Sequence, residues 1–86
     1  MKIYDFNGQK NICGKQIREA RFKQRLTQTD LAARIQVLGV NLERNGISKI
    51  ESGIRFVADY ELRAIAQALH VDVAWLLSGD DEKDEK

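Results

Sequence analysis

Apolar residues recur every three or four positions over most of this sequence, which is the period of an α-helix. The pattern predicts five short helices, over residues 14–26, 27–38, 44–52, 58–69 and 72–77. The residues expected to face inward are Ile17, Ala20, Leu31, Ala32, Ile35, Leu38, Val40, Ile47, Ile50, Ile54, Leu62, Ile65, Ala66, Leu69, Val73, Trp75, Leu76 and Leu77. Short links join the helices, so we expect one compact all-α domain.

Capping residues mark the predicted helix ends. The segment 27–30 is typical of a capping box. In such a box the Thr27 hydroxyl accepts a hydrogen bond from the Asp30 backbone N–H, and the Asp30 carboxylate reaches back toward the N-cap backbone. Gly39 and Gly53 are expected to end the second and third helices, because glycine readily adopts the left-handed conformation found there. The Asn45-Gly46 dipeptide also favours a tight turn, so the third helix starts either before or after this pair.

The chain has 86 residues, which fit one small domain with tails. We interpret residues 1–13 as an arm against a domain over 14–79, and residues 80–86 as a disordered acidic tail that lacks an apolar anchor. No apolar run approaches the ~18 residues that cross a bilayer, and the N-terminus lacks the apolar stretch of a signal peptide. We therefore expect a cytoplasmic protein without a membrane partner.

Few residues here suit catalysis or metal binding. The single cysteine, Cys13, cannot form an internal disulfide. Together with the single histidine, His70, it supplies too few ligands for a metal site. The sequence contains no glycine-rich phosphate loop and no suggestive carboxylate pair. We expect neither enzymatic activity nor a cofactor.

Charge is distributed unevenly along the chain. Residues 1–55 contain eleven Lys or Arg against five Asp or Glu, a net charge of +6, although the whole chain has a net charge of only +1. A basic front half and an acidic rear suit a polyanion that approaches from one side. An ordinary mixed surface would explain the charges equally well.

The two helices over residues 27–38 and 44–52 have the order of a helix-turn-helix, whose second helix is short and polar outside. Four blocks closely resemble the XRE family of lambdoid phage repressors and Cro. They are Leu26–Ala32, Ile47–Gly53, Ile65–Val71 and Trp75–Gly79. The resemblance covers residues 14–79 and implies the five-helix lambda-repressor-like fold and binding of double-stranded DNA.

The resemblance also implies site residues, because the third helix of this family enters the major groove. The matching exposed positions are Arg44, Asn45, Gly46, Ser48 and Lys49. Arginine and lysine can donate to guanine, and asparagine can bind adenine through two hydrogen bonds. Gly46 either lets the backbone approach DNA closely or occupies a position that is not read.

Four more residues match functional positions of the family that lie outside the exposed face of the third helix. Gln28 corresponds to a phosphate or base contact at the start of the second helix, and Arg55 to a loop on the DNA backbone. Arg21 and Glu51 correspond to a structural ion pair that joins the first and third helices.

The stretch from Leu31 to Ile47 is longer than the family's common form. We place extra residues in the second helix, through 36–38, where they are expected to add apolar contact. We place others in the turn at 41–42, where they are expected to touch phosphate.

The favoured function is a transcriptional regulator, most simply a repressor, that binds a pseudo-palindromic operator as a weak homodimer through the arm, Trp75 and Leu77. The alternative is an antitoxin or another protein-binding module with the same fold, which the aromatic arm and the acidic tail favour.

Overall fold

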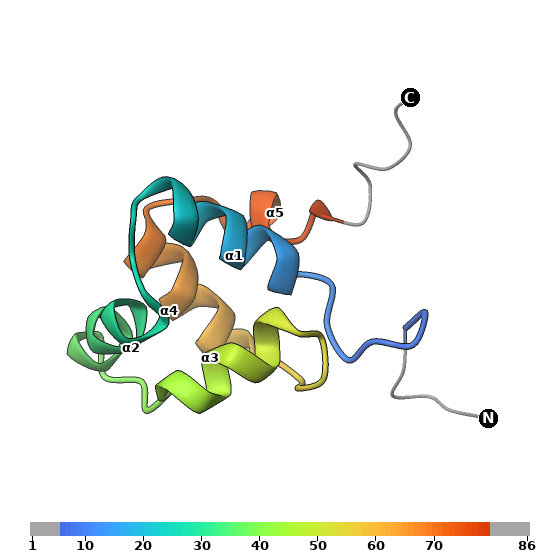
Figure 1. The fold of residues 1–86 in the computed structure, drawn as a ribbon, viewed down its shortest axis with the longest axis horizontal. Helices are drawn as coiled ribbons and strands as arrows, with labels where there is room; N and C mark the ends of the chain where they lie inside the picture. The colour runs from blue at the N-terminus through green and yellow to red at the C-terminus, as the bar shows by residue number, and fades with distance from the viewer. Residues whose placement is uncertain (1–5, 80–86) are drawn as a thin grey trace.

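The computed structural model describes residues 6–79, and this part of the chain contains five helices. They are α1 (Gly14–Lys23), α2 (Gln28–Val37), α3 (Arg44–Glu51), α4 (Asp59–Leu69) and α5 (Val73–Leu76). Figure 1 shows α1 and α4 side by side, with α2 and α3 below them and the short α5 beside the start of α1. The predicted all-α class is confirmed. No helix in residues 6–79 is long and apolar enough to cross a membrane.

One aliphatic core joins all five helices. Its largest fully buried apolar side chains are Ile17, Leu31, Ile35, Leu42, Ile47, Ile50, Ile65, Leu69 and Leu76. Full burial of such a side chain contributes roughly 1.5–3 kcal/mol relative to exposure, so this cluster supplies most of the driving force for folding. Because α3 contributes both Ile47 and Ile50 to it, the core fixes which face of α3 is turned outward.

The first four helices end in the same hydrogen-bonded turn. In each, a left-handed residue follows the helix, and the next residue donates a backbone hydrogen bond to the carbonyl five positions earlier. The left-handed residues are Arg25, Gly39, Gly53 and His70. The predicted capping box of α2 is present, with Asp30 N–H to Thr27 Oγ1 at 3.0 Å and Thr27 N–H to Asp30 Oδ2 at 2.9 Å.

The link between α2 and α3 differs from the prediction. Helix α2 ends at Val37, which is 86% exposed, and its C-cap residue Leu38 is 44% exposed, so neither belongs to the buried core. The extra residues 36–38 therefore add little apolar contact. Leu42, expected in a turn that touches phosphate, is instead a core residue.

Three further predictions about inward-facing residues are corrected by the structure. Ile54 is 62% exposed, because Gly53 (φ +81°) turns the chain outward after α3. Val73 is 36% exposed and Leu77 41% exposed, since the single turn of α5 directs only Leu76 fully into the core. The structure also decides between the two starts considered for the third helix. Helix α3 begins at Arg44, so the Asn45-Gly46 pair is helical and does not form a tight turn.

The segment before α1 lies against the end of α3. Lys10 N–H donates to the Gly53 carbonyl at 2.8 Å. The Asn11 amide donates to the carbonyls of Ile50 at 3.0 Å and Arg55 at 2.8 Å, while its oxygen accepts from Gly14 N–H at 2.8 Å. Asn11 thus connects the start of α1 to the end of α3. Residues 1–5 and 80–86 of the expected arm and tail lie outside the described residues.

Candidate DNA-binding surface

Helix α3 has a buried apolar face and an exposed polar face. Ile47 and Ile50 point into the core, which leaves Arg44, Asn45 and Lys49 exposed. Within residues 6–79 none of these three side chains makes a hydrogen bond or ion pair. The side-chain donors of these three residues and the side-chain carbonyl of Asn45 are therefore available to an external partner.

The two small residues of α3 are more enclosed. A Cβ added to Gly46 would lie 2.8 Å from Leu42 Cδ1 and 3.7 Å from Arg55 Nε, so a side chain here would require Leu42 to shift. Ser48 is half-buried, and its carbonyl accepts a hydrogen bond from the Ser52 hydroxyl at 3.0 Å.

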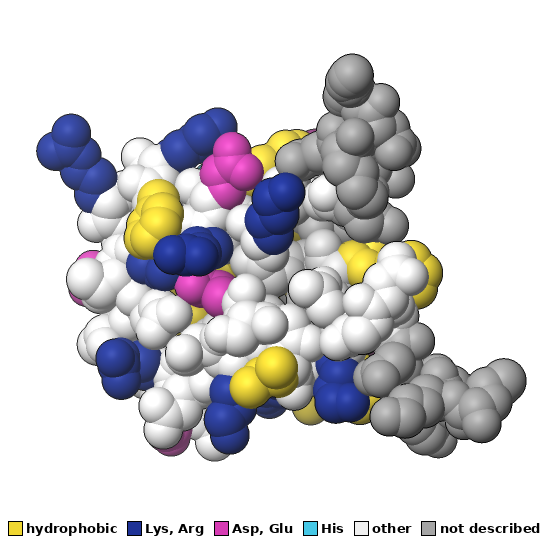
Figure 2. Space-filling view, turned by 45° about the vertical axis from the view of Figure 1, so that its right-hand side comes forward, with side chains coloured by type: hydrophobic (Ala, Val, Ile, Leu, Met, Phe, Trp, Pro, Cys, Tyr) yellow, Lys and Arg dark blue, Asp and Glu magenta, His cyan; other side chains and the backbone are white. Residues whose placement is uncertain are grey.

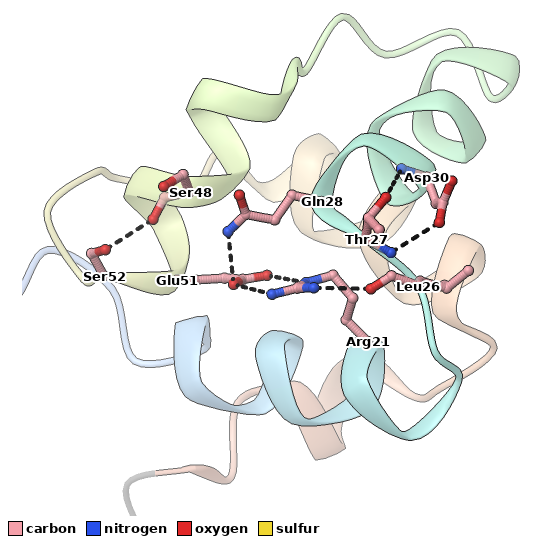
Figure 3. Close-up of polar contacts among 8 residues, drawn as sticks. All are labelled: Arg21, Leu26, Thr27, Gln28, Asp30, Ser48, Glu51 and Ser52. Atoms are coloured by element: carbon pink, nitrogen blue, oxygen red, sulfur yellow. Dashed lines mark hydrogen bonds and ion pairs between the residues drawn. The ribbon is translucent and has the colours of Figure 1, made fainter.

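A bidentate ion pair holds α3 to α1 (Figure 3). Arg21 Nε and Nη2 donate to the two Glu51 carboxylate oxygens at 2.8 and 2.9 Å. Only 8% of the Arg21 side chain and 5% of the Glu51 side chain are exposed. Hydrogen bonds from Arg21 to Glu51 raise the pKa of the Arg21 guanidinium further above its ordinary value.

The same ion pair reaches the start of α2. Arg21 Nη1 donates to the Leu26 carbonyl at 2.9 Å, and Gln28 Nε2 donates to Glu51 Oε1 at 3.1 Å. Figure 3 shows these groups converging between α1, α2 and α3. The orientation of α3 relative to the helix before it is thus fixed by polar contacts as well as by the core.

A second ion pair lies beyond the end of α3. Arg55 Nη1 and Nη2 donate to the two oxygens of Glu61 at 2.9 and 3.0 Å, and Nη1 also donates to the Phe56 carbonyl at 2.8 Å. Glu61 Oε1 accepts from Ala58 N–H at 3.0 Å as well, which caps α4. The bond from Arg55 is the main cause of the lowered pKa of Glu61. Arg55 is therefore held at the side of α3, next to Gly46.

The sequence left open whether Arg44 and Asn45 belong to the third helix, and the structure places both in α3. Sequence reasoning missed the partners that hold the neighbouring cations. Glu61 is one of these missed partners, although its place three residues after the α4 N-cap is a recognisable capping signal. Asn11 was missed because its partners are 39 and 44 positions away in the chain.

Figure 2 shows Lys and Arg side chains spread over the face it displays, with few acidic side chains among them.

A family model for helix-turn-helix domains matches residues 15–76, which contain all of α5 and all but the first residue of α1. The chain belongs to this family, the XRE-type helix-turn-helix proteins, and its fold is lambda-repressor-like. It is therefore a DNA-binding domain, and domains of this kind are non-catalytic. Searches among curated proteins and among solved structures gave no match.

Proposed function

We propose that this chain is a sequence-specific transcriptional repressor that inserts α3 into the major groove of a pseudo-palindromic operator. The observation that carries the proposal is the row formed by Arg44, Asn45 and Lys49, which are exposed and have no partner among residues 6–79. A helix held by its opposite face in a core, with free donors and acceptors outward, suits insertion into a groove about 12 Å wide.

The exposed side chains of α3 differ in the base that each of them reads. Arg44 and Lys49 donate to guanine, and Asn45 binds the adenine edge through its amide. Ser48 lies within the same surface and makes a weaker contact, while Gly46 contributes no side chain and lets Leu42 pack below.

Gln28 and Arg55 contact DNA phosphates on either side of this row. Both are already oriented by carboxylates, Gln28 by Glu51 and Arg55 by Glu61. Each keeps donor hydrogens beyond those bonds, because an amide nitrogen has two and a guanidinium has five. Such contacts set the position of α3 on the duplex without reading its sequence.

The proposed repressor binds as a weak homodimer, since one helix reads few base pairs and two half-sites ~34 Å apart supply the rest. A hollow of about 430 Å³ supports self-association, because the exposed side chains of Phe6, Phe56 and Leu77 line it. Sedimentation with and without DNA tests this, and a tight dimer in dilute solution without DNA would contradict the weak association.

The same apolar hollow supports the second candidate, a module of the antitoxin type that binds another protein. Co-purification from the source cells separates the two functions, because a stoichiometric protein partner with no operator in the genome would favour the module.

The deciding experiment is selection of bound fragments from random DNA at ~150 mM salt, followed by sequencing. Non-specific attraction weakens steeply with salt, so enrichment at this concentration reports base and shape readout. An enriched inverted repeat is expected. Retention of DNA only at low salt, without enrichment, would contradict the proposed function.

A further inference from the structure

Arg25 occupies a backbone conformation that is unfavourable for its residue type. It is the left-handed residue after α1, with φ +59°, and the equivalent position is glycine after α2 and after α3. A side chain at this position clashes with the backbone, and for this reason glycine predominates there. A long basic residue thus occupies a position where glycine would adopt the same backbone conformation with less strain.

The structure offers no internal partner that would explain this choice. Arg25 is exposed, and within residues 6–79 its guanidinium makes no hydrogen bond or ion pair. Arg21, Arg34 and Arg55 differ in this respect, because each of them donates to carbonyl or carboxylate oxygens of the domain.

Arg25 also lines a hollow that is continuous with the proposed DNA surface. The hollow has a volume of about 420 Å³, and its wall includes Gln28 and Thr29 from the first turn of α2 and Arg44 from α3. No acidic residue lines it. Since Glu51 neutralises Arg21, the uncompensated charges at its edge belong to Arg25 and Arg44.

We propose that Arg25 contacts a phosphate of the DNA backbone at this hollow, beside the strand that Gln28 and Arg44 engage. The inference rests on the proposed function and adds to it a phosphate contact from the turn between α1 and α2. The guanidinium suits a phosphate because it presents several donors in a fixed plane. The left-handed backbone is the structural cost of placing the side chain there.

The test compares Arg25→Gly with the wild-type chain on a fluorescent mixed-sequence duplex over a range of salt concentrations. We expect the variant to bind about three- to tenfold more weakly at low salt, with a slope of log affinity against log salt that is shallower by about 0.9. Its thermal midpoint should stay the same or rise, because glycine relieves the backbone conformation. Affinity and stability thus move in opposite directions.

His70→Gly is the matched control, since His70 has the same place in the turn after α4 and also has φ +59°. This variant should gain stability and bind DNA as the wild type does. Arg25→Lys should retain the salt slope, because it retains the charge. Wild-type affinity and slope in Arg25→Gly would overturn the inference alone. Failure of the wild-type chain to bind any duplex would overturn the proposed function as well.

Discussion

Arg21 and Glu51, thirty positions apart in the chain, form a nearly buried ion pair with two parallel hydrogen bonds of 2.8 and 2.9 Å. Because Arg21 also binds the Leu26 carbonyl and Glu51 also binds Gln28, one pair of side chains connects three helices. The contacts orient α3, so the presentation of its polar row depends on a residue of α1.

Removing one member of that pair should destabilise the domain. Glu51→Ala leaves a nearly buried guanidinium without its carboxylate, and we expect the free energy of unfolding to fall by about 3–5 kcal/mol in urea titrations. The double variant Arg21→Met, Glu51→Leu should recover much of this loss, because it leaves no buried charge unpaired. A loss below ~1 kcal/mol for Glu51→Ala would show that the pair is effectively solvated.

Gly14 should tolerate no side chain. An added Cβ would lie 2.2 Å from the Ile50 carbonyl oxygen, and a backbone atom cannot move aside without separating α1 from α3. We expect Gly14→Ala to lower the free energy of unfolding by about 3 kcal/mol, the upper end of the range typical of overpacked sites. Gly39→Ala is the control, since open space surrounds that position and only its left-handed φ of +87° opposes the change, at a cost of about 1–2 kcal/mol. Equal losses in the two variants would contradict the close approach.

The capping box of α2 should make stability depend on pH. Hydrogen bonds from the Thr27 backbone and then from its hydroxyl lower the pKa of Asp30. A lowered pKa in the folded state stabilises the protein above the ordinary carboxyl range, and this contribution is lost as the pH falls through the folded pKa. Asp30→Asn should therefore be less stable than the wild type near pH 6, and the difference should shrink between about pH 5 and pH 2. A difference that stays constant over this range would contradict the prediction.

Cys13 should be unreactive in the folded protein. The residue is only 2% exposed, and burial raises the pKa of its thiol to about 11. Since the thiolate is the reactive form, a disulfide reagent at pH 8 should modify the native chain at least about 100-fold more slowly than the chain in urea. The absorbance of the released thiol measures both rates, and similar rates would show that Cys13 is accessible.

The residues proposed to read bases and those proposed to contact phosphates should differ in how their loss affects binding. Asn45→Ala should relax the preference at one base position, at a cost of about 1–3 kcal/mol on the selected site only. Arg55→Ala should weaken binding on all sequences and lower the salt slope by about 0.9. Glu61→Gln is the matched control, because it weakens the ion pair but retains Arg55 and an acceptor for the Ala58 N–H. Uniform loss in both the Asn45 and the Arg55 variants would contradict the role of α3.

Local sequence determined the helices and most of their ends. The apolar stripes of α1, α2 and α4, the Thr27–Asp30 capping box and the turns at Gly39 and Gly53 depend on residues within a few positions of one another. The spacing of those residues is enough to predict them, because helix hydrogen bonds and caps are themselves local. The four sequence blocks that resemble the XRE family then predicted the fold, because they occur in the same order as in that family.

Tertiary packing decided which residues between and beyond the helices are buried or paired. Leu42 entered the core while Leu38 and Ile54 stayed exposed, although all three are large aliphatic residues in or beside the links that flank α3, so their burial depends on where the links run over the assembled helices. The Glu61 partner of Arg55 and the contacts of Asn11 with the end of α3 likewise depend on how separate segments meet. The sequence alone thus determined which helix presents the polar row, and the assembled core determined the contacts that hold that helix in place.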